Sequence, residues 1–175
     1  AGGWSLEHIH AQNAEALNTV DQWTAWLRFH AAALMDMPNL EEHGRTSLLG
    51  RIDALLSGTV SQQSFTLLEK ELTAVFAPAG ETDDSDVHSI SNLALLDHRD
   101  NAALNNSVFE VKRREIIRRD KEGSYIPTCT RNVFLKYYTD DADQQIHMWG
   151  PQDREAYYRT MRGVLAPYLD PEQGE

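Results

Sequence analysis

The stretch of residues 88–119 constrains the fold of this chain more than any other, because it joins three kinds of sequence. Residues 89–96 form an apolar run with the length of a strand. Residues 97–106 form a polar turn rich in Asp and Asn, and from Ser107 onward the pattern is that of a basic helix. A strand, a polar turn and a basic helix in this order can present a cation site to a phosphate backbone. The stretch contains no evident general base, so it predicts only half of a catalytic site.

The basic helix stands out because the chain as a whole is acidic. With 16 Lys and Arg against 27 Asp and Glu, the formal net charge is -11, which argues against nucleic-acid binding because phosphate contacts need cations. Yet six cations lie within ten residues: Lys112, Arg113, Arg114, Arg118, Arg119 and Lys121. A local basic patch can still bind DNA, with weaker long-range steering. We expect Asn106 or Ser107 to cap this helix, Glu110 to complete a capping box with Ser107, and Gly123 to end the helix.

The rest of the chain is mostly helical in its periodicity. Apolar residues recur at helical spacing over residues 21–35, 40–56, 61–76 and 153–168. Such stripes usually form a core, so we assign these helices no chemistry. Residues 4–10 alternate apolar and polar side chains, which is a strand signal. We interpret residues 78–86 as an exposed acidic loop; Asp83, Asp84 and Asp86 could instead bind a metal, but the EF-hand spacing with its central Gly is absent.

Composition excludes several classes of protein. The single cysteine, Cys129, rules out an internal disulfide framework and a zinc ribbon. No apolar run approaches the roughly 20 residues that span a bilayer, and no signal-peptide pattern opens the chain. We therefore expect a cytoplasmic setting without a membrane partner. We also expect the chain to be the C-terminal part of a longer protein.

The missing half of the catalytic site is predicted near the start of the chain, where Glu7 and His8 are adjacent. Phosphodiester hydrolysis needs a group that takes a proton from water, and the pKa of a histidine suits this task. It also needs a hard divalent cation bound by oxygen ligands, and cationic side chains that hold the backbone. Glu7 and Asn101 offer oxygens, and Lys112 offers a cation. Read without the second segment, His8 would be a buried strand histidine.

The residues that carry this chemistry also carry a resemblance. EHIHAQ, followed later by NLALLDHRDN, resembles the HNH, or His-Me finger, endonucleases. In that family an acidic residue and a His lie together on the first strand of a ββα unit, and an Asn on the second strand braces the loop that holds the His. A second Asn, nine positions on, completes the metal site. Asn92 and Asn101 have that spacing.

A narrower resemblance covers residues 4–12 and 88–168. SISNLALLD, NNSVFEVKRREI, IPTCTRNVFLKYY and the later W…DREAYY look like the C-terminal nuclease domain of GmrS–GmrD-type restriction proteins. Those proteins act against phage or otherwise modified DNA, and in them the domain follows a ParB-like NTPase domain. The resemblance therefore implies a nicking endonuclease domain of a restriction or phage-defence protein, with DNA and an N-terminal ParB-like NTPase domain as partners.

Residue by residue, the resemblance implies His8 as general base, Asn92 as the brace, and Glu7 and Asn101 as ligands of Mg²⁺, with Mn²⁺ as the alternative metal. Lys112 would contact phosphate. The wider DNA surface would include His10, Arg113, Arg114, Arg118 and Arg119, although His10 could instead join the metal site or face solvent. The chain departs from the family's pattern in two places: many HNH motifs have Pro where this chain has Ala11, and Asp where it has Glu7. Neither departure removes a required functional group.

The expected fold is α+β and mostly α, in one HNH nuclease domain over residues 1–175. Residues 4–12 and 88–123 would form a ββα-metal (His-Me finger) core, with a helical insertion at 19–77 between the two strands and C-terminal helices within 124–170. Two other functions remain open. The chain could be a DNA-binding module that does not cleave, or a helical protein-interaction domain in which the His and Asn residues are structural.

Overall fold

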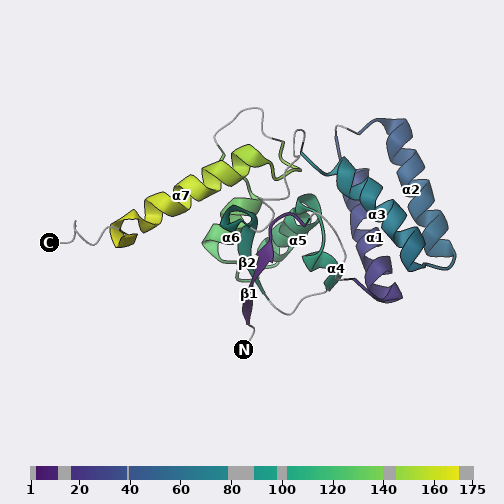
Figure 1. The fold of residues 1–175 in the computed structure, drawn as a ribbon, viewed down its shortest axis with the longest axis horizontal. Coiled ribbons are helices and arrows are strands. Elements are labelled where there is room, and N and C mark those ends of the chain that lie inside the picture. Colours follow the sequence, from purple (N-terminus) through teal and green to yellow (C-terminus); the bar gives the residue numbers. More distant parts are fainter. Residues whose placement is uncertain are drawn as a thin grey trace.

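The computed structural model describes residues 3–11, 17–38, 40–78, 89–97, 102–139 and 145–169. Within these ranges the chain is mostly helical, with one two-stranded antiparallel sheet (Figure 1). The elements are β1 (Trp4–His8), α1 (Val20–Met35), α2 (Glu42–Ser57), α3 (Gln62–Val75), a 3-10 turn (Ile90–Asn92), β2 (Leu93–Asp97), α4 (Ala102–Asn105), α5 (Phe109–Lys121), α6 (Thr128–Phe134) and α7 (Pro151–Leu169). Among the described helices, none combines the length and the hydrophobicity that a membrane span requires.

The two strands pair although three long helices separate them in sequence. In their antiparallel register, Glu7 lies opposite Ala94 and His8 opposite Leu93. Since side chains alternate along a strand, β1 has two faces: Ser5 and Glu7 belong to one face, and Trp4, Leu6 and His8 to the other. The expected mostly helical α+β fold, with helices between the strands, is confirmed.

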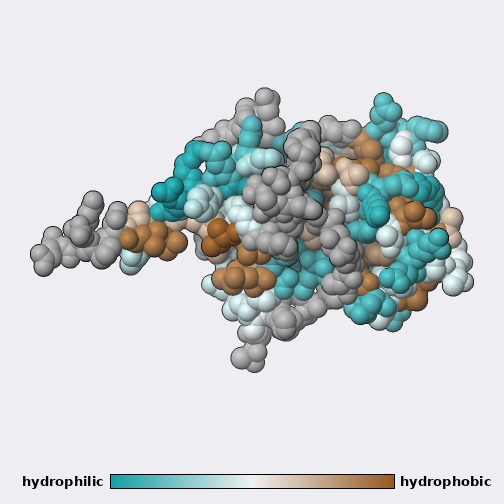
Figure 2. Space-filling view, viewed as in Figure 1, coloured by the Kyte–Doolittle hydropathy of each residue, from teal (hydrophilic) through white to brown (hydrophobic). Residues whose placement is uncertain are grey.

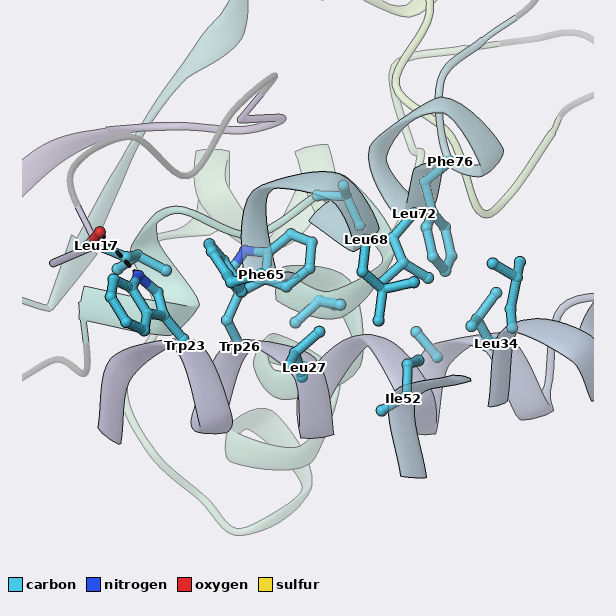
Figure 3. Close-up of a cluster of buried hydrophobic side chains, with 14 of the residues drawn as sticks. Leu17, Trp23, Trp26, Leu27, Leu34, Ile52, Phe65, Leu68, Leu72 and Phe76 are labelled. Carbon is cyan, nitrogen blue, oxygen red and sulfur yellow. Dashed lines mark hydrogen bonds between the residues drawn. The ribbon is translucent and has the colours of Figure 1, made fainter. Parts of the chain in front are cut away.

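The long helices α1, α2 and α3 form one hydrophobic core. Figure 3 shows Trp23, Trp26 and Leu27 of α1 facing Phe65 and Leu72 of α3. These residues recur at helical spacing, so each helix buries a single apolar stripe. The Nε1–H of Trp26 also donates to the carbonyl oxygen of Asn106 at 2.9 Å, which ties this core to the segment that leads into α5.

A second core lies between the sheet and the C-terminal helices. Here Phe109 of α5 stacks against Phe134 of α6 at 5.4 Å between ring centroids and against Trp149 at 5.6 Å. Ala94 and Leu96 of β2, with Ile9 directly after β1, bring the sheet into the same cluster. Because Val111 of α5 belongs to the first core and Phe109 to the second, α5 is the helix that joins them.

Two local predictions were wrong. The predicted strand at residues 89–96 begins only at Leu93, because Ile90–Asn92 form a 3-10 turn. The predicted helix start is also displaced, since α5 begins at Phe109 with Val108 as its N-cap, and the side chain of Val108 makes no capping bond. Gly123 follows α5 with φ of +79°, a conformation that favours glycine, as the predicted helix end requires.

The last helix, α7, extends away from the rest of the protein (Figure 1). Its projecting end is apolar in Figure 2 and includes the exposed Val164, Leu165, Tyr168 and Leu169. It contains Pro167, which cannot donate a helical backbone hydrogen bond. Only the first turns of α7 contribute buried residues: Asp153, Arg154 and Tyr157.

Candidate functional site

Glu7 and His8 lie at the end of β1, beside α5. Both side chains are partly buried, and the Oγ–H of Ser5 donates to Oε1 of Glu7 at 2.8 Å. The amine of Lys112, from α5, donates to the carbonyl oxygen of His8. The end of β1 is therefore held from the side of α5 by a side chain that contacts the backbone of the predicted general base.

The side chain of Lys112 is buried and not exposed to solvent. Its residue is 1% exposed, and burial lowers the pKa of its amine to about 7, while the nearby charge of Glu7 acts in the opposite direction. Removing an ammonium from water disfavours its charged form. The predicted phosphate contact does not follow from this position, because the amine points to the His8 carbonyl and is shielded from solvent.

Asn92 clamps the backbone just beyond His8. Its Oδ1 accepts from the backbone N–H of His10 at 3.1 Å, and its Nδ2 donates to the carbonyl oxygen of His10 at 3.1 Å. The backbone N–H of Ile9 donates to the carbonyl oxygen of Asn92 at 2.7 Å. These bonds fix the residues that follow β1, which is the type of contact that a brace requires.

His10 caps α5 from inside the protein. It is 2% exposed, and its Nδ1 accepts from the backbone N–H of Phe109 at 3.2 Å. Burial, followed by the charges of Lys112 and Arg154, lowers its pKa to about 3. The neutral ring therefore accepts the bond that the protonated ring would have to break. This buried position gives the predicted DNA contact by His10 no support.

His30 is a second buried histidine at the same helix end, and no functional role was predicted for it. Its Nε2 accepts from the backbone N–H of Val108 at 3.5 Å, while its Nδ1–H donates to the carbonyl oxygen of Trp26 at 2.8 Å. Burial is the main reason that its pKa falls to about 3. Its place in the apolar stripe of α1 was the signal for burial, but its partner lies 78 residues away in sequence.

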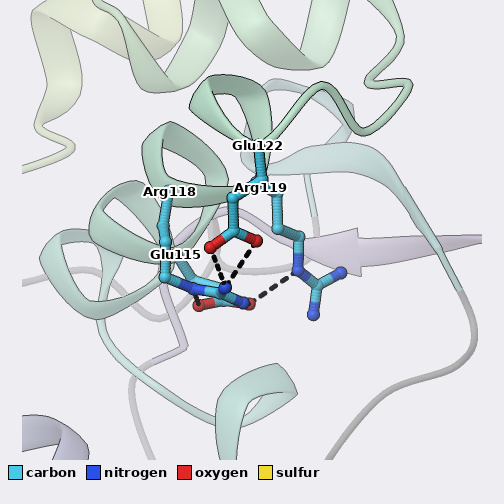
Figure 4. Close-up of polar contacts among 4 residues, drawn as sticks. All are labelled: Glu115, Arg118, Arg119 and Glu122. Atoms are coloured by element: carbon cyan, nitrogen blue, oxygen red, sulfur yellow. Dashed lines mark hydrogen bonds and ion pairs between the residues drawn. The ribbon is translucent and has the colours of Figure 1, made fainter.

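The arginines of α5 already have acidic partners. Arg118 donates to both Glu115 and Glu122, and Arg119 donates to Glu115 at 2.6 Å (Figure 4). Arg114 pairs with Asp36 of the loop after α1, and Arg113 lies 3.4 Å from Glu110. These four arginines were predicted to contact DNA. Their positions leave that prediction open, but their charges are balanced within the protein.

Other predicted ligands lie outside the described residues. These are Asn101, the second predicted metal ligand, and the acidic alternatives Asp83, Asp84 and Asp86. Within the described ranges, no group of three or more His, Cys, Asp or Glu residues converges as a metal site would. The described part of the chain thus brings together Glu7, His8, Asn92 and Lys112, and it supplies one carboxylate for a metal.

A buried ion pair lies close to this site but is separate from it. Lys136, at φ of +60°, pairs with Asp153 and lies over the rings of Phe109 and Trp149 at 5.1 and 5.4 Å from their centroids. Asp153 also accepts from the backbone N–H of Gly150 at 2.8 Å. All these contacts lie inside the second core, so we assign Lys136 to the attachment of α7.

Comparisons of the chain with protein families, with curated proteins and with solved structures found no match.

Proposed function

We propose that the chain is a metal-dependent DNA endonuclease domain of HNH type, which nicks one strand. The observation that supports this most strongly is the way in which the end of β1 is held. Asn92 clamps the backbone two residues beyond His8, and Lys112 binds the carbonyl oxygen of His8 itself. These two buried polar side chains come from the 3-10 turn before β2 and from α5, and both hold a strand that ends in Glu7 and His8.

The strands and helix have the order and contacts that a ββα-metal core would need. β1 and β2 pair antiparallel, and α5 contacts β1 through Lys112 and supplies Phe109 and Ile116 to the core beneath the sheet. The three helices between the strands would then be an insertion. This finer description of the fold, as a His-Me finger, is part of the proposal.

Glu7 is chemically suited to hold a divalent metal. Mg²⁺ usually keeps several waters and binds proteins through one or two carboxylates together with substrate phosphates, so a single described carboxylate at a partly exposed strand end fits it. The lowered pKa of Lys112 reduces the positive charge that would oppose a cation there. When bound by Glu7, with Asn101 as the second proposed ligand, Mg²⁺ or Mn²⁺ would stabilise negative charge on the phosphate.

The chain's own residues would do the rest of the chemistry. His8 would take a proton from the water that attacks the phosphorus in line with the leaving 3′ oxygen. Asn92 and Lys112 would hold His8 in place without contacting DNA. One site of this kind cuts one strand, so a double-strand break would need two sites. The wider assignment, to a restriction or phage-defence protein with a ParB-like NTPase domain, rests on the sequence resemblance alone.

The paired arginines favour one alternative, a helical protein-interaction domain. Arg118 and Arg119 share carboxylate partners on their own helix, so the basic stripe is a weaker electrostatic attractant than its sequence indicates. The second alternative, a DNA-binding module without cleavage, differs from the main proposal only in chemistry. DNA binding without nicking would favour that module, and neither DNA nor metal binding would favour the interaction domain.

The proposal is tested by incubating supercoiled plasmid with the protein in Mg²⁺ or Mn²⁺ and measuring its conversion to the relaxed form. We expect His8→Ala to slow nicking by about 100-fold or more, because a general base contributes about that much. His43→Ala is the matched control, since His43 is exposed on α2, and it should nick as the parent protein does. Equal rates in the His8 and His43 variants would rule out the assigned base.

A further inference from the structure

A cavity of about 430 Å³ opens at the far end of the sheet from His8. The start of β1, β2, the C-terminal half of α5 and residues 124–127 surround it; its lining includes Trp4, Leu95, Ile116, Arg118, Arg119 and Tyr125. Ligand sites in proteins commonly have volumes of about 300 to 1,000 Å³ and combine apolar walls with a few polar groups. The cavity has the size and the mixed lining of a site for one small planar group.

Two aromatic rings in the lining of this cavity are exposed. Trp4 is 46% exposed and Tyr125 is 79% exposed. Their ring centroids lie 5.8 Å apart at an interplanar angle of 74°, an edge-to-face arrangement that fixes one ring against the other. Exposed aromatic faces of this kind are surfaces on which nucleobases stack, with little dependence on sequence.

Arg118 contributes a third flat surface. Its Nε and Nη2 donate to Glu115 at 2.9 and 2.7 Å, and its Nη1 donates to Glu122 at 2.7 Å (Figure 4). Most of its N–H groups are thus occupied, and the two carboxylates hold the guanidinium in one orientation. What such an arginine offers a ligand is the face of its plane, which stacks on aromatic rings and bases.

One lining residue of the cavity, Trp4, lies on the same face of β1 as His8. Trp4, Leu6 and His8 share a face of β1, and Leu6, which is exposed, lies opposite Leu95 of β2. At about 3.3 Å per residue, Trp4 and His8 are about 13 Å apart. This separation is about four steps of a DNA strand at about 3.4 Å each, so a strand cut at His8 could reach the cavity within a few nucleotides.

We infer that this cavity binds one nucleobase of the DNA strand on which the site at Glu7 and His8 acts. The inference rests on the proposed nuclease function and extends it, because it assigns a second contact to the same strand. The base would stack on Trp4 or Tyr125 and against the plane of Arg118. A base inside a duplex exposes no face for stacking, so the cavity should select single-stranded or unstacked DNA.

Tryptophan fluorescence measures this binding directly. The chain has 4 Trp residues, and Trp23, Trp26 and Trp149 are buried, so Trp4 is the one that a bound base can reach. We expect a short oligothymidylate, titrated in EDTA to prevent cleavage, to quench the emission. The quenching should be lost in Trp4→Phe. Absence of quenching in the parent protein would overturn the inference.

A matched pair of tyrosine variants locates the binding. Tyr125→Ala should weaken the affinity for oligothymidylate by about tenfold, which is a typical loss for one stacked base. Tyr168→Ala should not, because Tyr168 is as exposed, at 82%, but lies on α7. Equal affinities in the two variants would refute the site.

Nicking in Mg²⁺, measured on the same preparations, separates the two proposals. His8-dependent nicking without base binding refutes only the binding of a base in the cavity, and base binding without nicking refutes only the nuclease activity.

Discussion

Acidification should destabilise this protein at pH values well above those at which its carboxylates become protonated. The reason is the pair of buried imidazoles, His10 and His30, that accept hydrogen bonds from the backbone N–H groups of Phe109 and Val108 at the start of α5. In the folded protein each has its pKa lowered from 6.5 to about 3. Between these pH values the unfolded chain binds protons that the folded protein does not, so the free energy of unfolding is greatest above pH 6.5 and falls as the pH is lowered towards 3.

The size of the effect follows from the pKa values. A pH of 5 lies about 1.5 units below the pKa that each imidazole has in the unfolded chain. Each imidazole therefore reduces the free energy of unfolding by about 2 kcal/mol at pH 5 relative to pH 7. The two together give about 4 kcal/mol, a large part of the 5 to 15 kcal/mol that is typical of a domain. Asp36, Glu71 and Glu115 have lowered pKa values, but their contributions are lost mainly below about pH 4.5.

Urea unfolding at pH 7 and pH 5, followed by circular dichroism, measures this difference. His30→Gln removes one of the two titrating groups, so the loss between the two pH values should fall to about 2 kcal/mol. Its own cost at pH 7 cancels, because each variant is compared with itself. His43→Gln, at an exposed position on α2, should keep the full loss. If the parent protein is equally stable at both pH values, the capping histidines do not titrate as their burial demands.

Two further predictions concern the residues around the end of β1. Asn92→Ala should lower the free energy of unfolding by about 2 to 4 kcal/mol in urea unfolding, because it leaves the buried N–H and C=O of His10 without their side-chain partner; a loss below 1 kcal/mol would contradict the clamp. Lys112→Met should reduce the kcat of nicking by about 100-fold with little change in KM, because the amine positions His8 and does not hold DNA. A raised KM at unchanged kcat would contradict this role and support the phosphate contact that was predicted from the sequence.

The helices could be predicted from the sequence because their signals are local. The apolar stripes of α1, α2 and α3 are contained in windows of a few turns, and each helix has to bury its stripe somewhere. The start of α5 could not be predicted in this way. Its first N–H groups are bonded by His10 and His30, which are 99 and 78 residues distant in sequence, whereas a capping-box pattern considers only four neighbouring residues.

The burial of Lys112 did have a local signal. Phe109, Lys112 and Ile116 are spaced by three and four residues, so they share one face of α5, and both apolar members of that face lie in the core. The cluster of cations in the sequence concealed this periodicity. The partners of Arg118 were also readable, since Glu115 and Glu122 lie three and four residues from it, but the pairing of Arg114 with Asp36 depends on how α5 packs beside α1.

The ion pairs of α5 determine what the helix could contribute to DNA binding. Arg118 and Arg119 would exchange a carboxylate partner for a phosphate, and such an exchange brings little net charge attraction when the freed carboxylate remains nearby. A helix of this kind can orient a DNA strand but cannot supply most of the affinity for it. If the chain acts on DNA, much of the binding free energy must therefore come from uncharged contacts, such as stacking at Trp4 and Tyr125. The dependence of DNA affinity on salt should accordingly be shallower than six free cations would give.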